Sequence, residues 1–387
     1  MLRFYPAVTA FYILFPAFVV SQVLFFAGYS NFQFPGGLTL LAALCIPILA
    51  LKSSAAFMRY KQYALASRVT FFGFLLVFFL SLLFGEASEN VEKSHMAGLI
   101  QMLGLYLMAR HWPANIDSRS LHRIVAALIM ISALILWTSP ILSVGGILDL
   151  VFVRFNYQAV AMAILAMSFF VMPNLDGKLK WTVLSVTLAT FFAVGARSEI
   201  IAFVFSTIAV EFLRRGPSGK SFMKMILFSA IFLGIFTFIL NSWFPDSRVW
   251  GLLTLTADDS FIARSELVPE AWRTIMQSPI LGSYGEYRDG YYVHNILSAW
   301  VDTGLLGFGL LLATIVFCAF RLRPSGNEID KLYLSAVMCF ISAVILMLFA
   351  KYFSYPLIGM AVGLVVRNAI NQRHYPRRHT VKFGLNH

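Results

Sequence analysis

A histidine and an asparagine stand where a long apolar run begins. Residues 291–312 read YYVHNILSAWVDTGLLGFGLLL, so His294 and Asn295 directly precede a stretch long enough for a membrane helix. An imidazole whose pKa is near neutral can take up or deliver a proton. Spacing alone favours a plainer interpretation, because histidine and tyrosine side chains also anchor helices at a membrane surface. Both interpretations remain open at this point.

Two arginines lie close to the expected membrane surface. Arg154 lies in the apolar stretch LVFVRFNYQAV, and Arg197 lies in the tight connection GARSEII. A charge at such depth is costly unless it pairs or faces a wet cavity, which makes each arginine a functional candidate. Snorkelling or a pair with Glu199 would explain Arg197 equally well, and an interfacial position would explain Arg154. Together with Arg264 in the nearest large loop, the guanidinium groups favour a site for a polyanion such as phosphate.

These side chains must be positioned by membrane helices. Hydrophobic residues make up 59% of the 387-residue chain and charged residues only 12%, whereas soluble domains have about 45–50% and about 25%. The alternation typical of outer-membrane barrel strands is absent. We predict an all-α polytopic integral membrane protein with about 12 transmembrane helices. They are expected at roughly 8–28, 37–51, 69–84, 95–109, 124–139, 156–172, 181–196, 200–213, 225–241, 298–320, 332–350 and 353–366.

The net charge of +12 follows this topology. If the N-terminus is cytoplasmic, every second loop is basic and the intervening loops are not, as the positive-inside rule requires. Both termini are then cytoplasmic, and the charge gives no support to a nucleic-acid partner. The first apolar segment lacks a clear cleavage site and is expected to be retained as a span. Cys45, Cys318 and Cys339 lie inside apolar runs, which argues against disulfides and against a zinc site.

One large loop interrupts the single transmembrane domain of residues 1–387. It covers 242–297, between the ninth and tenth spans, on the outer face. Its many aromatic residues favour an ordered loop with short helices. The stretch 261–278 has helical spacing, and turn residues follow it. Asp258 and Asp259 precede this helix, where paired acids are more often caps than metal ligands.

Several segments resemble the O-antigen ligase and O-antigen polymerase superfamily. RSELVPEAWRTIMQSPILGSYGEY followed by HNILSAWVDTGLLGFGLLL resembles its core signature: an arginine-bearing helix, a proline–leucine–glycine turn, and a histidine–asparagine pair entering a helix with a glycine–leucine–x–glycine end. VRFNYQAVAMA resembles the family's arginine–asparagine segment, and GARSEIIAF its small-residue–arginine turn. The strong match covers about 261–312. The surroundings of Arg154 depart from the family's fuller glycine–x–proline–asparagine context.

The resemblance implies a C-type glycosyltransferase in the bacterial inner (cytoplasmic) membrane, with its active site facing the periplasm. Its donor would be a glycan on undecaprenyl diphosphate. A polymerase transfers that glycan to an acceptor hydroxyl of another lipid-linked repeat unit, and a ligase transfers it to the lipid A core. Membrane lipid and a chain-length regulator protein are further implied partners.

Chain length and the compact external loop favour the polymerase. A transporter or lipid-linked oligosaccharide flippase is the alternative from another class. A six-plus-six repeat is not found, and the polar residues cluster on one face instead of lining a path through the midplane, which counts against that alternative.

The resemblance also implies roles for individual residues. His294 would hold or deprotonate the acceptor hydroxyl. Arg154, Arg197 and Arg264 would stabilise the diphosphate leaving group as a fixed electrostatic clamp. Many C-type transferases use a metal held by a carboxylate of the first external loop instead.

The first external loop of this chain, YSNFQFPGG, contains no acid. We therefore expect a reaction without metal or cofactor. Asn295 and one of the tyrosines, Tyr291 or Tyr292, are expected to orient sugar hydroxyls.

Overall fold

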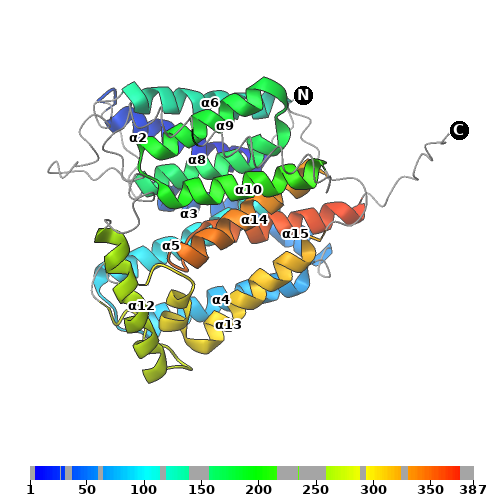
Figure 1. Ribbon diagram of the computed structural model, residues 1–387. Coiled ribbons are helices and arrows are strands. Elements are labelled where there is room, and N and C mark those ends of the chain that lie inside the picture. The colour runs from blue at the N-terminus through cyan, green and yellow to red at the C-terminus, as the bar shows by residue number, and fades with distance from the viewer. Residues whose placement is uncertain are drawn as a thin grey trace, which may run out of the picture.

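Long apolar helices run side by side, and an amphipathic helix, α12, lies across one end of them (Figure 1). The computed structural model describes residues 5–26, 28–30, 37–59, 64–113, 119–138, 157–215, 234, 259–287, 293–323 and 330–374. All regular elements within these ranges are helical, which confirms the predicted all-α class.

The elements of the described ranges are α1 (Pro6–Tyr12), the π-helical η1 (Ile13–Ala17), α2 (Phe18–Phe26), α3 (Gly37–Arg59), α4 (Leu65–Phe84), α5 (Glu89–Arg110), α6 (Arg119–Thr138), α8 (Tyr157–Val171), the 3₁₀-helical η2 (Met172–Asn174), α9 (Gly177–Ala193), α10 (Arg197–Arg215), α12 (Asp259–Gln277), α13 (Leu297–Arg321), α14 (Lys331–Phe349) and α15 (Leu357–His374). Each predicted span coincides with a helix, except 225–241, which apart from residue 234 lies outside the described residues. The helix predicted at 261–278 is α12.

Four described segments are long and apolar enough to cross a membrane: Pro6–Phe25, Leu65–Phe84, Leu297–Arg321 and Lys331–Phe349. Several others are apolar but shorter, so the number of crossings stays a prediction. The free faces of α4 and α13 expose large apolar side chains, among them Leu76, Leu80, Leu306 and Phe320. Water does not favour such a surface, whereas lipid tails cover it at no cost.

The helix directions sort the connecting segments into two groups. Helices α5 and α15 run parallel, since Gly98 approaches Ser354 and Tyr106 approaches Gly363. Helices α10 and α14 run antiparallel, because Glu199 pairs with Lys351 while Ser206 bonds Ser342.

Residues 84–95, 197–199, 278–287, 293–304 and 350–357 therefore meet at the end where α12 lies, which we name the α12 end. Residues 110–113, 173–180, 211–215, 320–323 and 330–333 lie at the opposite end. The segments at the α12 end are those that the charge pattern predicts to be external, whereas the opposite end collects segments predicted to be cytoplasmic.

Helix α13 is broken near its start. Gly304 has φ 64° and ψ −172°, a conformation that is accessible to glycine and strained for other residues. The turn that follows α12 fills the break: Ser283 N–H donates to Val301 O at 2.7 Å, and Leu305 N–H donates to Pro279 O at 3.0 Å. Backbone groups released by the break are thus satisfied by the turn.

The break predicts a position-dependent response to alanine in α13. A methyl group on Gly304 would collide with the carbonyl of Ile280, so Gly304→Ala should destabilise the protein by about 1–3 kcal/mol. Gly309→Ala in the same helix is the matched control. It has open space around its Cβ position and should be neutral or stabilising by up to about 1 kcal/mol. Thermal unfolding in detergent measures both, and equal midpoints would contradict the packing described here.

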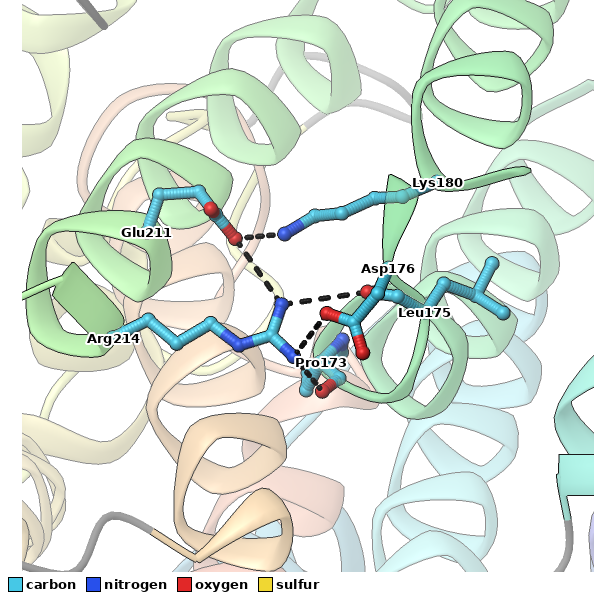
Figure 2. Close-up of polar contacts among 6 residues, drawn as sticks. All are labelled: Pro173, Leu175, Asp176, Lys180, Glu211 and Arg214. Carbon is cyan, nitrogen blue, oxygen red and sulfur yellow. Dashed lines mark hydrogen bonds and ion pairs between the residues drawn. The ribbon is translucent and has the colours of Figure 1, made fainter. Parts of the chain in front are cut away.

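A partly buried charge cluster holds three elements together at the opposite end (Figure 2). Lys180 of α9 pairs with Glu211 of α10, and their side chains are only 7% and 8% exposed. Arg214 donates to the carbonyls of Pro173 and Leu175 at 3.3 and 3.4 Å, where η2 ends. It also lies 2.9 Å from Asp176 and 3.7 Å from Glu211. The cluster ties α9 and α10 to the end of η2.

Breaking this buried pair should cost much more than breaking a surface pair. Glu211→Gln leaves the Lys180 charge buried without its counter-ion, so we expect a loss of about 3–5 kcal/mol. Combining Lys180→Met with Glu211→Leu should recover most of that loss, since neither charge then remains buried. Glu89→Gln is the control: it removes an exposed pair with Lys93 and should change stability by less than about 0.5 kcal/mol. A double variant as unstable as Glu211→Gln would contradict this interpretation.

Candidate functional site

His294 and Asn295 lie directly before α13, as predicted from the sequence. The side-chain oxygen of Asn295 accepts a hydrogen bond from Leu297 N–H at 2.9 Å. Its main-chain oxygen accepts one from the Ser298 hydroxyl at 2.6 Å. Both oxygens of Asn295 therefore accept hydrogen bonds from the first residues of α13. His294 is half-buried beside Val293, which is buried against Ala271 of α12.

Arg197 is the first residue of α10 and is half-buried. Two residues on, Glu199 is 2% exposed and lies 2.9 Å from the ammonium group of Lys351. The contact is an ion pair without hydrogen-bond alignment; the other oxygen of Glu199 accepts from the Ser198 hydroxyl at 2.8 Å. Lys351 thus places a second positive charge near the start of α10, and none of the sequence motifs quoted above contains it.

The segment that follows Lys351 connects the two halves of the α12 end. Phe353 N–H donates to the Ser298 hydroxyl at 3.1 Å, and Ser298 in turn bonds Asn295. A continuous series of contacts therefore runs from the start of α10, through 351–353, to the start of α13. It joins the element that carries Arg197 to the element that carries His294.

Arg264 lies in the first half of α12, and the second half of that helix packs on α13. Ala271 and Ile275 contact Val293 and Val301 there. The structure thus brings the elements that carry Arg197, Arg264, His294 and Asn295 to one end. That these side chains line one cavity stays a prediction. Arg154, Tyr291 and Tyr292 lie outside the described residues.

Helix α13 also contains a buried acidic residue that the sequence analysis does not name as a site residue. Asp302, in α13 beside the break, is 0% exposed. One of its oxygens accepts a hydrogen bond from Gly285 N–H at 3.2 Å, and the other accepts one from the Tyr287 hydroxyl, also at 3.2 Å. Among the described residues no basic side chain forms an ion pair with it. An acid inside an apolar run is itself a signal of function, and the sequence offers that signal at the DTG of SAWVDTGLLG.

Three further side chains extend this network. The Tyr287 oxygen lies 2.8 Å from the Tyr352 hydroxyl and 3.4 Å from His95 Nε2. The other ring nitrogen of His95 lies 2.9 Å from the Tyr284 hydroxyl. Burial raises the pKa of Tyr284, with a further contribution from the Asp302 charge, so its phenol stays protonated and donates.

One set of hydrogen positions satisfies the network with Tyr287 as donor to Asp302. Tyr284 then donates to His95 Nδ1, and both His95 Nε2–H and the Tyr352 hydroxyl donate to the Tyr287 oxygen. All of these bonds are directed towards Asp302. His95 is thereby held neutral and buried beside Tyr284 and Tyr352, and its ring stacks on that of Tyr352 with the ring centroids 4.9 Å apart.

A pocket opens between α12, α13 and this network. It encloses about 30 Å³, a volume comparable with one or two water molecules. Its apolar lining includes Leu267, Ala271, Val293 and Val301. Its polar lining residues are Glu270, Thr274, Glu286, Tyr287, Ser298, Asp302 and Tyr352.

The described residues define an all-helical protein with segments long enough to cross a membrane. No family model and no curated protein matches the chain. Any more specific assignment therefore depends on the segments quoted above and on the arrangement of the α12 end.

The network predicts unequal effects of two tyrosine substitutions. Tyr287→Phe removes the hydroxyl donor of the buried Asp302 carboxylate and should destabilise the protein by about 1–3 kcal/mol. Tyr355→Phe is the control, since the Tyr355 hydroxyl is buried without a hydrogen-bond partner among the described residues and its loss should be neutral. Chemical denaturation in mixed micelles compares the two variants. A Tyr355→Phe loss as large as that of Tyr287→Phe would show that the network contributes nothing specific.

Proposed function

We propose that the chain is a membrane glycosyltransferase that uses a glycan on undecaprenyl diphosphate, most specifically a surface-polysaccharide polymerase at the outer face of the bacterial inner membrane. One observation carries this proposal. The elements bearing Arg197, Arg264, His294 and Asn295 meet at a single end, and the positive-inside rule assigns that end to the outside.

The chemistry needs a base and an anion clamp in one place. The acceptor hydroxyl attacks the anomeric carbon, its proton passes to a base, and the bond to the lipid diphosphate breaks. His294 is the candidate base, because a neutral imidazole can accept this proton near neutral pH. Arg154, Arg197 and Arg264 are the candidate clamp for the diphosphate charge that develops as the bond breaks.

The Glu199–Lys351 pair lies two residues from Arg197 and supports the proposed placement of Arg197 near His294. A buried ion pair is weak evidence for stability, since its desolvation offsets its attraction. The pair does restrict geometry. It holds the start of α10 against residues 351–353, and Phe353 in turn bonds Ser298 at the start of α13. The pair would keep the Arg197 backbone in a constant position relative to His294.

A ligase that transfers the glycan to the lipid A core would use the same residues and the same donor. The two activities differ in the acceptor. Supplying purified protein with donor alone, or with donor and lipid A core, separates them: elongated lipid-linked glycan marks the polymerase. Consumption of donor only in the presence of lipid A core marks the ligase.

The histidine provides the test of the reaction itself. His294→Ala should slow glycan transfer by about 10²–10⁴-fold, the usual effect of losing a general base, while donor binding is retained. The assay follows glycan length on gels with protein in lipid nanodiscs and a lipid-linked repeat unit as donor. His374→Ala, in α15 at the opposite end, is the matched control and should transfer at the normal rate.

Two outcomes would contradict the proposal. If His294→Tyr transfers glycan normally, the residue is an interfacial anchor, because only its amphipathic character would then matter. If wild-type protein consumes no lipid-linked donor with either acceptor, the glycosyltransferase assignment is wrong.

A further inference from the structure

Helix α12 has a wide apolar side, and α13 covers only part of it. Ala271 and Ile275 lie on the stripe that is buried against α13. Trp272 and Met276, each one residue further along the chain, form the adjoining stripe, and Met276 is 73% exposed. Arg273 begins the polar side of the helix. An amphipathic helix normally covers its whole apolar side, so the stripe of Trp272 and Met276 needs a partner.

The turn after α12 adds two more exposed apolar side chains beside this stripe. Ile280 is 68% exposed and Leu281 is 84% exposed. Their backbone lies against the break in α13, because a methyl group on Gly304 would meet main-chain atoms of both residues. We name Trp272, Met276, Ile280 and Leu281 the α12 apolar face.

The α12 apolar face continues into a surface of α13 that lipid covers. The ring of Trp272 lies 6.1 Å from that of Trp300, and Trp300 in turn stacks on Phe308 with the ring centroids 4.9 Å apart. Leu305 and Leu306, next along α13 from the break, are exposed on its free face. Apolar surface therefore extends from the free face of α13 to α12 through a series of aromatic contacts.

The length of α13 gives the depth of this surface in the membrane. The helix has 25 residues and ends at Arg321, which marks one boundary of the hydrocarbon core. A core of about 30 Å takes about 20 residues of helix, and a tilted helix takes more. Counted back from Phe320, that length reaches about Val301. Gly304 and the turn packed on it thus lie at the level of the acyl chains.

Hydrogen bonding within the turn is consistent with this depth. Non-helical backbone at membrane depth needs partners from the protein, since lipid tails offer none. The main-chain oxygen of Pro279 accepts from Leu305 N–H at 3.0 Å and from the indole N–H of Trp300 at 2.8 Å. Gly282 N–H donates to the main-chain oxygen of Ser278 at 2.9 Å. The turn can therefore face lipid with its apolar side chains while these polar groups remain paired.

We propose that the α12 apolar face is immersed in the acyl chains of the membrane leaflet at the α12 end. Helix α12, which lies across the ends of the long helices (Figure 1), is then a membrane helix that lies in the plane of the leaflet. Its bounds contain three acids and two arginines, so apolar burial and not attraction to anionic lipid holds it there. The inference goes beyond the proposed function and does not depend on it.

Spin labels on neighbouring positions of α12 and its turn test this placement. The full chain, with its three native cysteines replaced, carries one label at a time in phosphatidylcholine nanodiscs. The labelled variants are Met276→Cys and Leu281→Cys in the α12 apolar face, with Arg273→Cys and Gln277→Cys on the polar side as matched controls. Molecular oxygen concentrates among acyl chains, whereas a nickel chelate stays in water. We expect oxygen to relax the first two labels more than nickel does, and the order to reverse for the two controls.

Three results would overturn the proposal. Greater relaxation by nickel at all four positions would place α12 in water. Labels at Met276→Cys and Leu281→Cys that neither reagent reaches would show that protein, from this chain or a second copy, covers the face. Oxygen access that appears only when anionic phosphatidylglycerol is added would show that charge holds the helix at the membrane.

Tryptophan fluorescence provides a second measurement without labels. The emission that wild-type protein has and Trp272→Phe lacks comes from Trp272, whose side chain is partly exposed. Lipids with brominated acyl chains should quench this difference, because bromine quenches a tryptophan that it contacts, and acrylamide in the water should quench it less. Strong quenching by acrylamide with none by brominated lipid would contradict the immersion of the α12 apolar face.

Discussion

The hydrogen bonds that close the gap in α13 are the constraint on which the α12 end depends. Pro279 and Ser283 take up the backbone groups that Gly304 leaves without helical partners. A turn held only by side-chain contacts could shift along its neighbour. The turn after α12 instead pairs its own backbone groups with those of α13, and this pairing allows only one alignment of the two segments. That register carries Tyr284 and Tyr287 to His95 and Asp302, and it fixes the direction from which α12 packs on α13.

The break also accounts for a buried acid in an apolar helix. At Asp302 the chain leaves its regular path, so the amide of Gly285 can approach the carboxylate, which a continuous helix would leave without main-chain donors. Two donors offset part of the cost of burying the carboxylate. The carboxyl group of Asp302 is thus held by the turn and by the Tyr287 hydroxyl.

Local patterns sufficed for the helices and for the position of His294, since hydropathy and capping act over a few residues. The 261–278 segment formed the helix that its spacing predicts, and Asn295 lies just before α13. The network could not be predicted in this way. His95 and Tyr287 are separated by 192 positions, and only the packing of α4, α5 and α13 brings them within hydrogen-bond distance. The ion pair of Lys351 with Glu199 could likewise not be predicted, because the two residues lie far apart in the chain.

The exposed and the buried residues that line the pocket between α12 and α13 differ in how much the fold depends on them. Asp302 is fixed by its backbone and phenol partners, so replacing it disturbs the fold as well as the pocket. Glu270 and Glu286 are exposed and contribute little to packing, and exposed positions tolerate substitution with small effects on stability. Substitutions at Glu270 and Glu286 can therefore change the lining of this pocket while the fold is kept.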